Sequence, residues 1–99
     1  MSIRGVTTIS KGAQTIVAGG VAQTVFVANG RNFLLIQNNH ATEALFVGIG
    51  FTPTVGIGIW LKGGGGVDST LMLSGNDIPN DAISVIAAAT GHAFIAIQE

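Results

Sequence analysis

The chain has 99 residues, of which only 9% are charged; four Lys or Arg stand against five Asp or Glu, there is no cysteine, and the formal net charge is −1. This length predicts a single domain over residues 1–99, and the lack of cysteine excludes disulfides, thiolate metal sites and cysteine nucleophiles. The basic residues are isolated from one another in sequence, which argues against a nucleic-acid partner: Arg4, Lys11, Arg31 and Lys62.

The beginning of the chain is rich in small residues and has weakly defined apolar faces. Residues 3–9 and 14–17 predict short strands, and residues 1–20 as a whole predict either edge strands or an N-terminal arm that pairs with a neighbouring subunit. An alternating strand over 23–28 then leads into Asn29-Gly30, a pair that favours a tight hairpin because both residues tolerate positive φ. We therefore expect a hairpin between this strand and the next.

The rest of the chain continues as short strands. The segment 31–38 has apolar residues on both faces, which predicts a central strand covered by a second sheet or by another subunit. No segment has the apolar spacing of a helix, since the one candidate, 81–89, is rich in β-branched residues. Further strands are expected over 43–50, 57–62, 71–73, 83–88 and 93–97. About eight short strands at this spacing predict an all-β fold, an antiparallel β-sandwich or jelly roll.

The longest uncharged stretch, residues 44–61, approaches the length of a membrane span. Its glycines, its proline and its alternating apolar residues are poorly suited to a lipid-spanning helix. The first five residues are not followed by a leucine-rich core, so no signal peptide is predicted. We expect a soluble, unexported chain with no membrane partner.

The glycine-rich and acidic segments lack the spacing of ligand-binding motifs. The four glycines at 63–66 are not followed by Lys-Ser/Thr and a helix, as a phosphate-binding loop requires, so a simple loop between strands is expected. Asp68, Asp77 and Asp81 do not have the spacing of a calcium loop. Their neighbours favour turns in which the side chains bond local amides.

His40 and His92 are the only histidines, and they are far apart in sequence. Two imidazoles could share a metal or act as bases, but neither lies in a ligand-spaced motif, so surface or turn positions are expected for both. No serine lies in a Gly-x-Ser-x-Gly nucleophile elbow. The sequence therefore predicts no enzyme activity, no catalytic residue, no cofactor and no metal site.

The small number of charges predicts an exposed apolar surface. A typical soluble domain carries about a quarter charged residues, and a chain of this size leaves much of its surface in water. Because contiguous apolar patches usually mark a partner site, the composition predicts a subunit of a closed, symmetric homo-oligomer. The side chains expected as anchors, for intersubunit or core burial, are Phe33, Leu35, Phe46 and Trp60.

Several segments resemble small virion proteins of tailed bacteriophages. The strand Arg-Asn-Phe-Leu-Leu-Ile-Gln-Asn at 31–38 is followed by a polar turn and by Leu-Phe-Val-Gly-Ile-Gly at 45–50. The later pieces agree, at 58–61 before the glycine-rich loop, at 82–88 before Thr90-Gly91, and at the closing residues 97–99. The likeness covers residues 31–99, although the family often carries Pro-Gly where this chain has Lys62-Gly63.

The resemblance implies a capsid cement or decoration subunit, a β-sandwich that forms a homotrimer and stabilises the shell by binding the major capsid protein or other virion proteins. It also implies a location in the virion after synthesis in the host cytoplasm. The alternative is a glycan- or receptor-binding knob of a fibre, or a neck or tail component. A glycan-binding knob would place Trp60, Phe51, His40 and the Asn38-Asn39 turn on an exposed rim.

Overall fold

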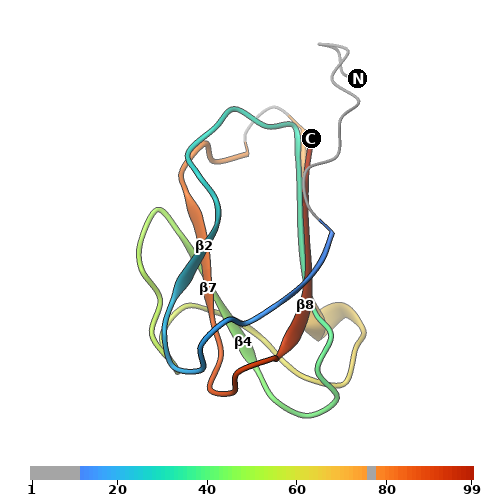
Figure 1. The fold of residues 1–99 in the computed structure, drawn as a ribbon. Helices are drawn as coiled ribbons and strands as arrows, with labels where there is room; N and C mark the ends of the chain where they lie inside the picture. The colour runs from blue at the N-terminus through green and yellow to red at the C-terminus, as the bar shows by residue number, and fades with distance from the viewer. Residues whose placement is uncertain (1–11, 76–77) are drawn as a thin grey trace.

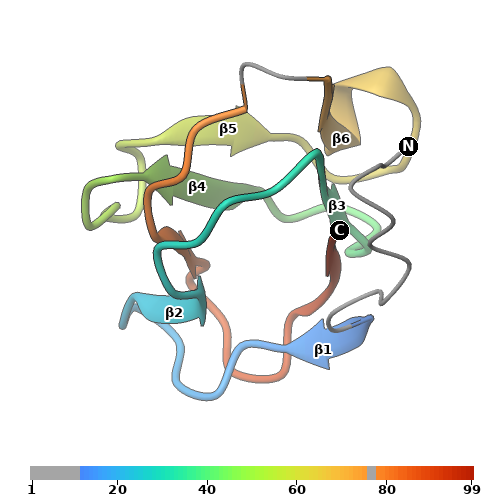
Figure 2. The same cartoon turned by 90° about the horizontal axis from the view of Figure 1, so that it is seen from above.

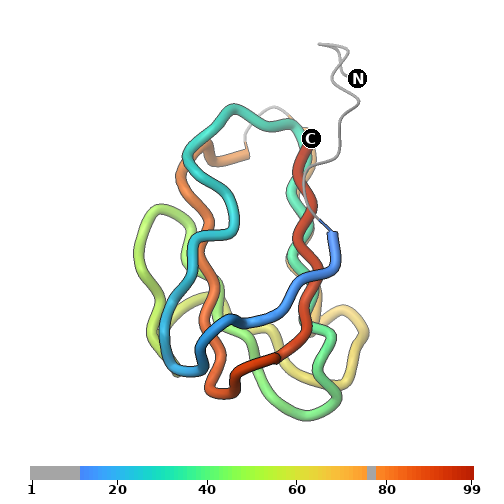
Figure 3. Tube along the Cα trace, in the orientation of Figure 1, coloured from blue at the N-terminus to red at the C-terminus, as the bar shows by residue number. Residues whose placement is uncertain are grey.

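The computed structural model describes residues 12–75 and 78–99, which form two four-stranded antiparallel sheets facing one another (Figures 1 and 3). The one helical element in these residues is a three-residue 3-10 turn, so the predicted all-β fold is confirmed. The elements are β1 (Ala13–Thr15), β2 (Gln23–Phe26), β3 (Phe33–Asn38), β4 (Leu45–Ile49), β5 (Ile59–Leu61), η1 (Val67–Ser69), β6 (Thr70–Ser74), β7 (Ile83–Ile86) and β8 (Ala93–Gln98).

The strand order follows a single rule. Sheet A has the order β1-β8-β3-β6 and sheet B the order β2-β7-β4-β5, and Figure 2 shows β1, β3 and β6 on one side of the molecule and β2, β4 and β5 on the other. The first half of the chain pairs with the second half in reverse order: β1 with β8, β2 with β7, β3 with β6 and β4 with β5. Two antiparallel four-strand stretches rolled into facing sheets make a jelly roll.

The prediction of a hairpin at Asn29-Gly30 is wrong, because the strands before and after this pair belong to different sheets. Strand β2 lies in sheet B and pairs with β7, whereas β3 lies in sheet A and pairs with β6 and β8. Gly30 is not among the glycines with positive φ, although a type I′ hairpin turn needs positive φ at both central residues. The β2–β3 connection instead crosses from one sheet to the other, so the local turn signal is overridden by tertiary contacts.

Arg31 anchors this crossing and is only 4% exposed. Its Nη1 donates to the carbonyl oxygens of Pro79 at 2.6 Å and Asp81 at 3.1 Å. Its Nη2 donates to the carbonyl of Val27 at 3.3 Å, and its Nε to Oε1 of Gln98 at 2.8 Å. Burial lowers the pKa of Arg31, and the nearby charge of Asp81 acts in the opposite direction. One guanidinium thus joins the β2–β3 connection, the β6–β7 connection and the end of β8.

The core lies between the two sheets and follows the alternation of the strands. In β3 the inward residues Leu34 and Ile36 are completely buried, and β3 is the central strand that its apolar faces predict. Most of the facing side chains come from β4 and β7. The buried apolar cluster consists of Ile16, Val25, Phe26, Leu34, Ile36, Leu45, Val47, Leu61, Ile78, Ile83, Val85, Ala87, Phe94 and Ala96.

The β4–β5 connection folds back over the outside of sheet B. Pro53 is buried there, and a Cβ at Gly48 would overlap the carbonyl oxygen of Phe51 and the ring of Pro53. Only a glycine in β4 allows this close approach of backbone to sheet. The connection therefore covers part of the outer face of sheet B.

The beginning of the chain is described from residue 12 onward. Strand β1 lies at the edge of sheet A, next to β8, as the edge-strand alternative predicts for this part of residues 1–20. The strand expected over 3–9, and the part of the proposed N-terminal arm before residue 12, lie outside the described residues.

Candidate functional site

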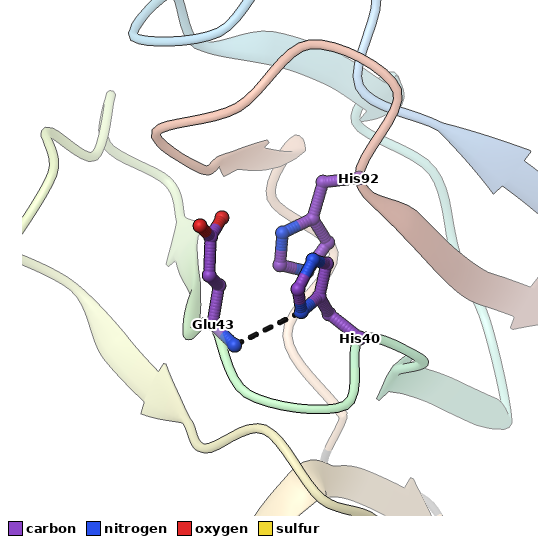
Figure 4. Close-up of side chains that lie close together, drawn as sticks. All are labelled: His40, Glu43 and His92. Atoms are coloured by element: carbon purple, nitrogen blue, oxygen red, sulfur yellow. Dashed lines mark hydrogen bonds between the residues drawn. The ribbon is translucent and has the colours of Figure 1, made fainter.

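The two histidines meet at one end of the sandwich, beside Glu43 (Figure 4). Because β3 and β8 are antiparallel neighbours, the residues that follow β3 lie next to those that precede β8, and Asn38 pairs with Phe94. The ring centroids of His40 and His92 are 4.7 Å apart, with 31° between the ring planes. The prediction that His92 lies at the surface is wrong, since its side chain is only 2% exposed.

Asn38 holds the side chain of His92 and the backbone of His40. Its Nδ2 donates to the carbonyl oxygens of Glu43 at 2.8 Å and Leu61 at 2.9 Å. Its Oδ1 therefore serves as acceptor, for the backbone N–H of His40 at 3.0 Å and for Nε2 of His92 at 2.7 Å. An acceptor opposite Nε2 requires that neutral His92 carry its proton on Nε2, which leaves a lone pair on Nδ1. Nδ1 of His92 is buried and has no hydrogen-bond partner in the described structure.

His40 has the same tautomer as His92, but its Nδ1 has hydrogen-bond partners. Its Nδ1 accepts the backbone N–H groups of Thr42 at 3.1 Å and Glu43 at 3.0 Å. A neutral imidazole that accepts at Nδ1 carries its proton on Nε2. One potential ligand atom from each of His40, Glu43 and His92 lies within 4.8 Å of the others, so this group could hold a metal ion. Glu43 is exposed and His40 is half-buried, so the group opens to solvent on one side.

The surroundings of His92 favour the neutral form of its ring. Burial is the main cause that lowers the pKa of His92; the charge of His40 lowers it further, and Glu43 partly raises it. An uncharged imidazole with a free lone pair can bind a metal ion or accept a proton.

We expect the stability of the protein to fall as the pH drops below about 6.5, the ordinary pKa of histidine in an unfolded chain. Between this pH and the lowered pKa of folded His92, the histidine is protonated in the unfolded chain but not in the folded protein. The free energy of unfolding therefore decreases as the pH falls through this range. Urea unfolding between about pH 8 and pH 5 measures this. A His92→Gln variant is the control, and an equal pH slope in wild type and variant would contradict the assignment.

The four predicted anchor residues all point away from the core. Phe33 and Leu35 lie on the outward face of β3 in sheet A, between the buried inward residues. Phe46 and Trp60 are a cross-strand pair of β4 and β5 in sheet B, with ring centroids 6.3 Å apart. Trp60 is 61% exposed, so the core alternative is wrong for it, and none of the four belongs to the buried apolar cluster. Their role as interface anchors stays a prediction.

Sheet A carries an outer apolar face around these residues. Leu35 lies directly opposite Ile97 on one side and Met72 on the other, which makes a row of three apolar side chains across β8, β3 and β6. Met72 is 63% exposed, and its neighbours in the row are partly exposed. The outer apolar face consists of Phe33, Leu35, Met72, Ile95 and Ile97.

The other candidate segments carry no comparable geometry. The glycines at 63–66 lead into the three-residue turn η1, which is too short to present a phosphate-binding helix end. Among the described residues, neither Asp68 nor Asp81 belongs to a group that could hold a metal ion, and Asp77 lies outside them. The exposed rim expected for glycan binding is wrong in part, because Asn38 is 1% exposed, although Phe51 and Trp60 are exposed.

Comparisons with known proteins find no match for this chain. No protein-family model, no curated protein and no solved structure matches it significantly. Within the described ranges, no helix is long and apolar enough to cross a membrane. A proposal for function therefore depends on the residues and their arrangement.

Proposed function

We propose that this chain is a structural subunit of a bacteriophage particle, a capsid cement or decoration protein that forms a homotrimer and stabilises the shell. The observation that carries the proposal is the distribution of charge. None of the eight described strands contains Lys, Arg, Asp or Glu, and the charged residues of the described chain all lie in connections or at residue 99. Soluble sheets usually protect their edges with charges, especially lysine. Uncharged strands suit a protein whose sheets are covered in an assembly.

The outer apolar face of sheet A is the surface that we assign to self-association. Its row of three large apolar side chains crosses neighbouring strands in register, so the three side chains form a continuous apolar contact surface. Contiguous exposed apolar surface of this kind marks interaction sites in soluble proteins. A closed symmetric ring would cover it on every subunit.

Sheet B carries the surface that we assign to the capsid shell. Ile57, which is 68% exposed, and the Phe46–Trp60 pair lie on and beside β5, at the edge of sheet B. Lys62 is placed with its Nζ 5.7 Å from the centroid of the Trp60 ring. Because these side chains belong to the other sheet, a subunit could contact its sister subunits and the shell at the same time. The jelly-roll fold is compatible with this role, since viral capsid domains use it, as do lectins.

A Leu35→Lys substitution is expected to weaken the trimer at least tenfold, because it places a charge in the middle of an apolar contact. Light scattering after size exclusion measures the mass of wild type and variant over a range of concentrations. The substituted side chain points outward, so the far-ultraviolet circular dichroism is expected to stay unchanged.

Thr24→Lys is the matched control, since Thr24 is an exposed strand residue of sheet B away from the outer apolar face. It is expected to leave the trimer intact. A wild-type monomer at all concentrations, or a trimer that tolerates Leu35→Lys, would overturn the assigned interface.

The phage role itself is tested by co-sedimentation with empty capsids and by a glycan array. Binding to capsids, weakened by Trp60→Ala, is the result expected for a cement protein. Specific binding to a sugar without capsid binding would instead favour the receptor-binding alternative, for which the exposed Phe51 and Trp60 are the available aromatic side chains.

A further inference from the structure

We propose that His92, Glu43 and His40 form a binding site for a divalent transition-metal ion of the zinc type, at the end of the sandwich where the β3–β4 and β7–β8 connections meet (Figure 4). The site is separate from both apolar faces and does not depend on the proposed role in a capsid.

His92 has the environment of a metal ligand. Its Nε2–H is donated to Oδ1 of Asn38, and Asn38 is itself held by two backbone carbonyls. Metal-binding histidines nearly always donate their second ring N–H to an oxygen acceptor in this way, which fixes the tautomer and directs the other nitrogen at the ion. Nδ1 of His92 is buried and unpartnered, and Figure 4 shows it on the side of the ring that faces the Glu43 carboxylate. A bound ion would satisfy this orphaned acceptor.

Glu43 and His40 complete the set of ligands. The three ligand atoms lie within 4.8 Å of one another, whereas ligand atoms around a tetrahedral zinc ion are about 3.4 Å apart. Closing the difference shortens the longest of these separations by about 1.4 Å, which the exposed Glu43 side chain and the exposed residues beside it can supply by moving. Two imidazoles and one carboxylate favour Zn²⁺ over Mg²⁺ and Ca²⁺, which prefer oxygen ligands. A water molecule would occupy the fourth position.

Binding at His40 has a structural consequence that can be observed. Nδ1 of His40 is occupied by the N–H groups of Thr42 and Glu43, so Nε2 is the nitrogen available to an ion. Coordination through Nε2 moves the ring proton to Nδ1, which then no longer accepts these two hydrogen bonds. Thr42 and Glu43 are exposed, so water can take over their N–H groups. Ion binding therefore switches the tautomer of His40 and frees the backbone N–H groups of Thr42 and Glu43 from its ring.

The test uses the full chain, freed of metal by a chelator and titrated with Zn²⁺ at neutral pH. Calorimetry is expected to show one ion per chain, and the melting temperature should rise by roughly 10 °C or more when free Zn²⁺ exceeds the dissociation constant a hundredfold. Mg²⁺ and Ca²⁺ are expected to give no shift. The amide signals of Thr42 and Glu43 should move on binding, and nitrogen-15 spectra of the imidazoles should report the tautomer change at His40.

The decisive variants are Glu43→Gln and His40→Gln, because Glu43 is exposed and His40 is only half-buried, and circular dichroism shows whether each variant is folded. Each is expected to weaken Zn²⁺ binding at least tenfold, while Asp68→Asn, which changes an exposed carboxylate elsewhere, leaves it unchanged. His92→Gln should abolish binding, and circular dichroism shows whether that variant is folded. Absence of binding by the wild type, or binding that persists in both Glu43→Gln and His40→Gln, would overturn the proposal.

Discussion

An Asn38→Ala variant is expected to lower the free energy of unfolding by about 3 kcal/mol. Asn38 is 1% exposed and makes four hydrogen bonds, which join β3 to the β3–β4 connection, to β5 and to His92. Truncation leaves the carbonyl oxygen of Leu61 and the Nε2–H of His92 unpaired in a buried environment, and each such group costs about 1–3 kcal/mol. Urea unfolding at neutral pH measures the loss.

Asn39→Ala is the matched control, since the neighbouring side chain is exposed and makes no hydrogen bond in the described structure. It should change the free energy of unfolding by less than about 0.5 kcal/mol. An Asn38→Asp variant keeps the acceptor for His92 and loses the two donated bonds, so it should raise the pKa of His92 by placing a carboxylate against its ring. Equal stabilities of Asn38→Ala and Asn39→Ala would show that the four hydrogen bonds of Asn38 contribute little to the free energy of unfolding.

An Arg31→Met variant is expected to lose about 3 kcal/mol of stability. Methionine can fill much of the volume, but it leaves three backbone carbonyls and the Gln98 side chain without their donor. Arg31→Lys should lose about 2 kcal/mol, because an ammonium keeps the charge but cannot donate in three directions from one plane. Thermal and urea unfolding of the three proteins give the comparison.

Lys62→Met controls for removal of a positive charge without loss of a buried network. Lys62 is exposed and lies over the Trp60 ring, so a change of less than about 0.5 kcal/mol is expected. If Arg31→Met were as stable as Lys62→Met, the buried guanidinium would not be what holds the crossing between the sheets.

The strands of this protein are predictable from local alternation, because their inward and outward residues differ in apolar character. In β3 the residues Leu34 and Ile36 face the core, and Phe33 and Leu35 face outward, as a period of two requires. The same register carries Asn38 inward, two residues beyond Ile36. The alternation therefore predicts an inward Asn38, but a polar residue beside Asn39 and His40 also suggests a turn. The burial of Asn38 was missed for this reason.

Pairing between distant strands could not be predicted in this way. Asn29-Gly30 favours a hairpin locally, but the four hydrogen bonds of buried Arg31 reach segments that only the folded chain brings near. The histidine pair has the same origin. His40 and His92 meet because the end of β3 lies beside the beginning of β8. Alternation predicts which face of a strand each residue lies on, but it does not predict which strands are neighbours in the sheet.

The position of β8 makes the order of synthesis important for this fold. Strand β8 is among the last parts of the described chain to be made, yet it lies between β1 and β3 in sheet A. Until it leaves the ribosome, β1 has no partner in the sheet and β3 has one bare, uncharged edge that a neighbouring nascent chain can reach. Pairings between such distant segments also make folding slow. If synthesis stalls before residue 93, β8 is missing and the strands of sheet A on either side of it cannot be joined.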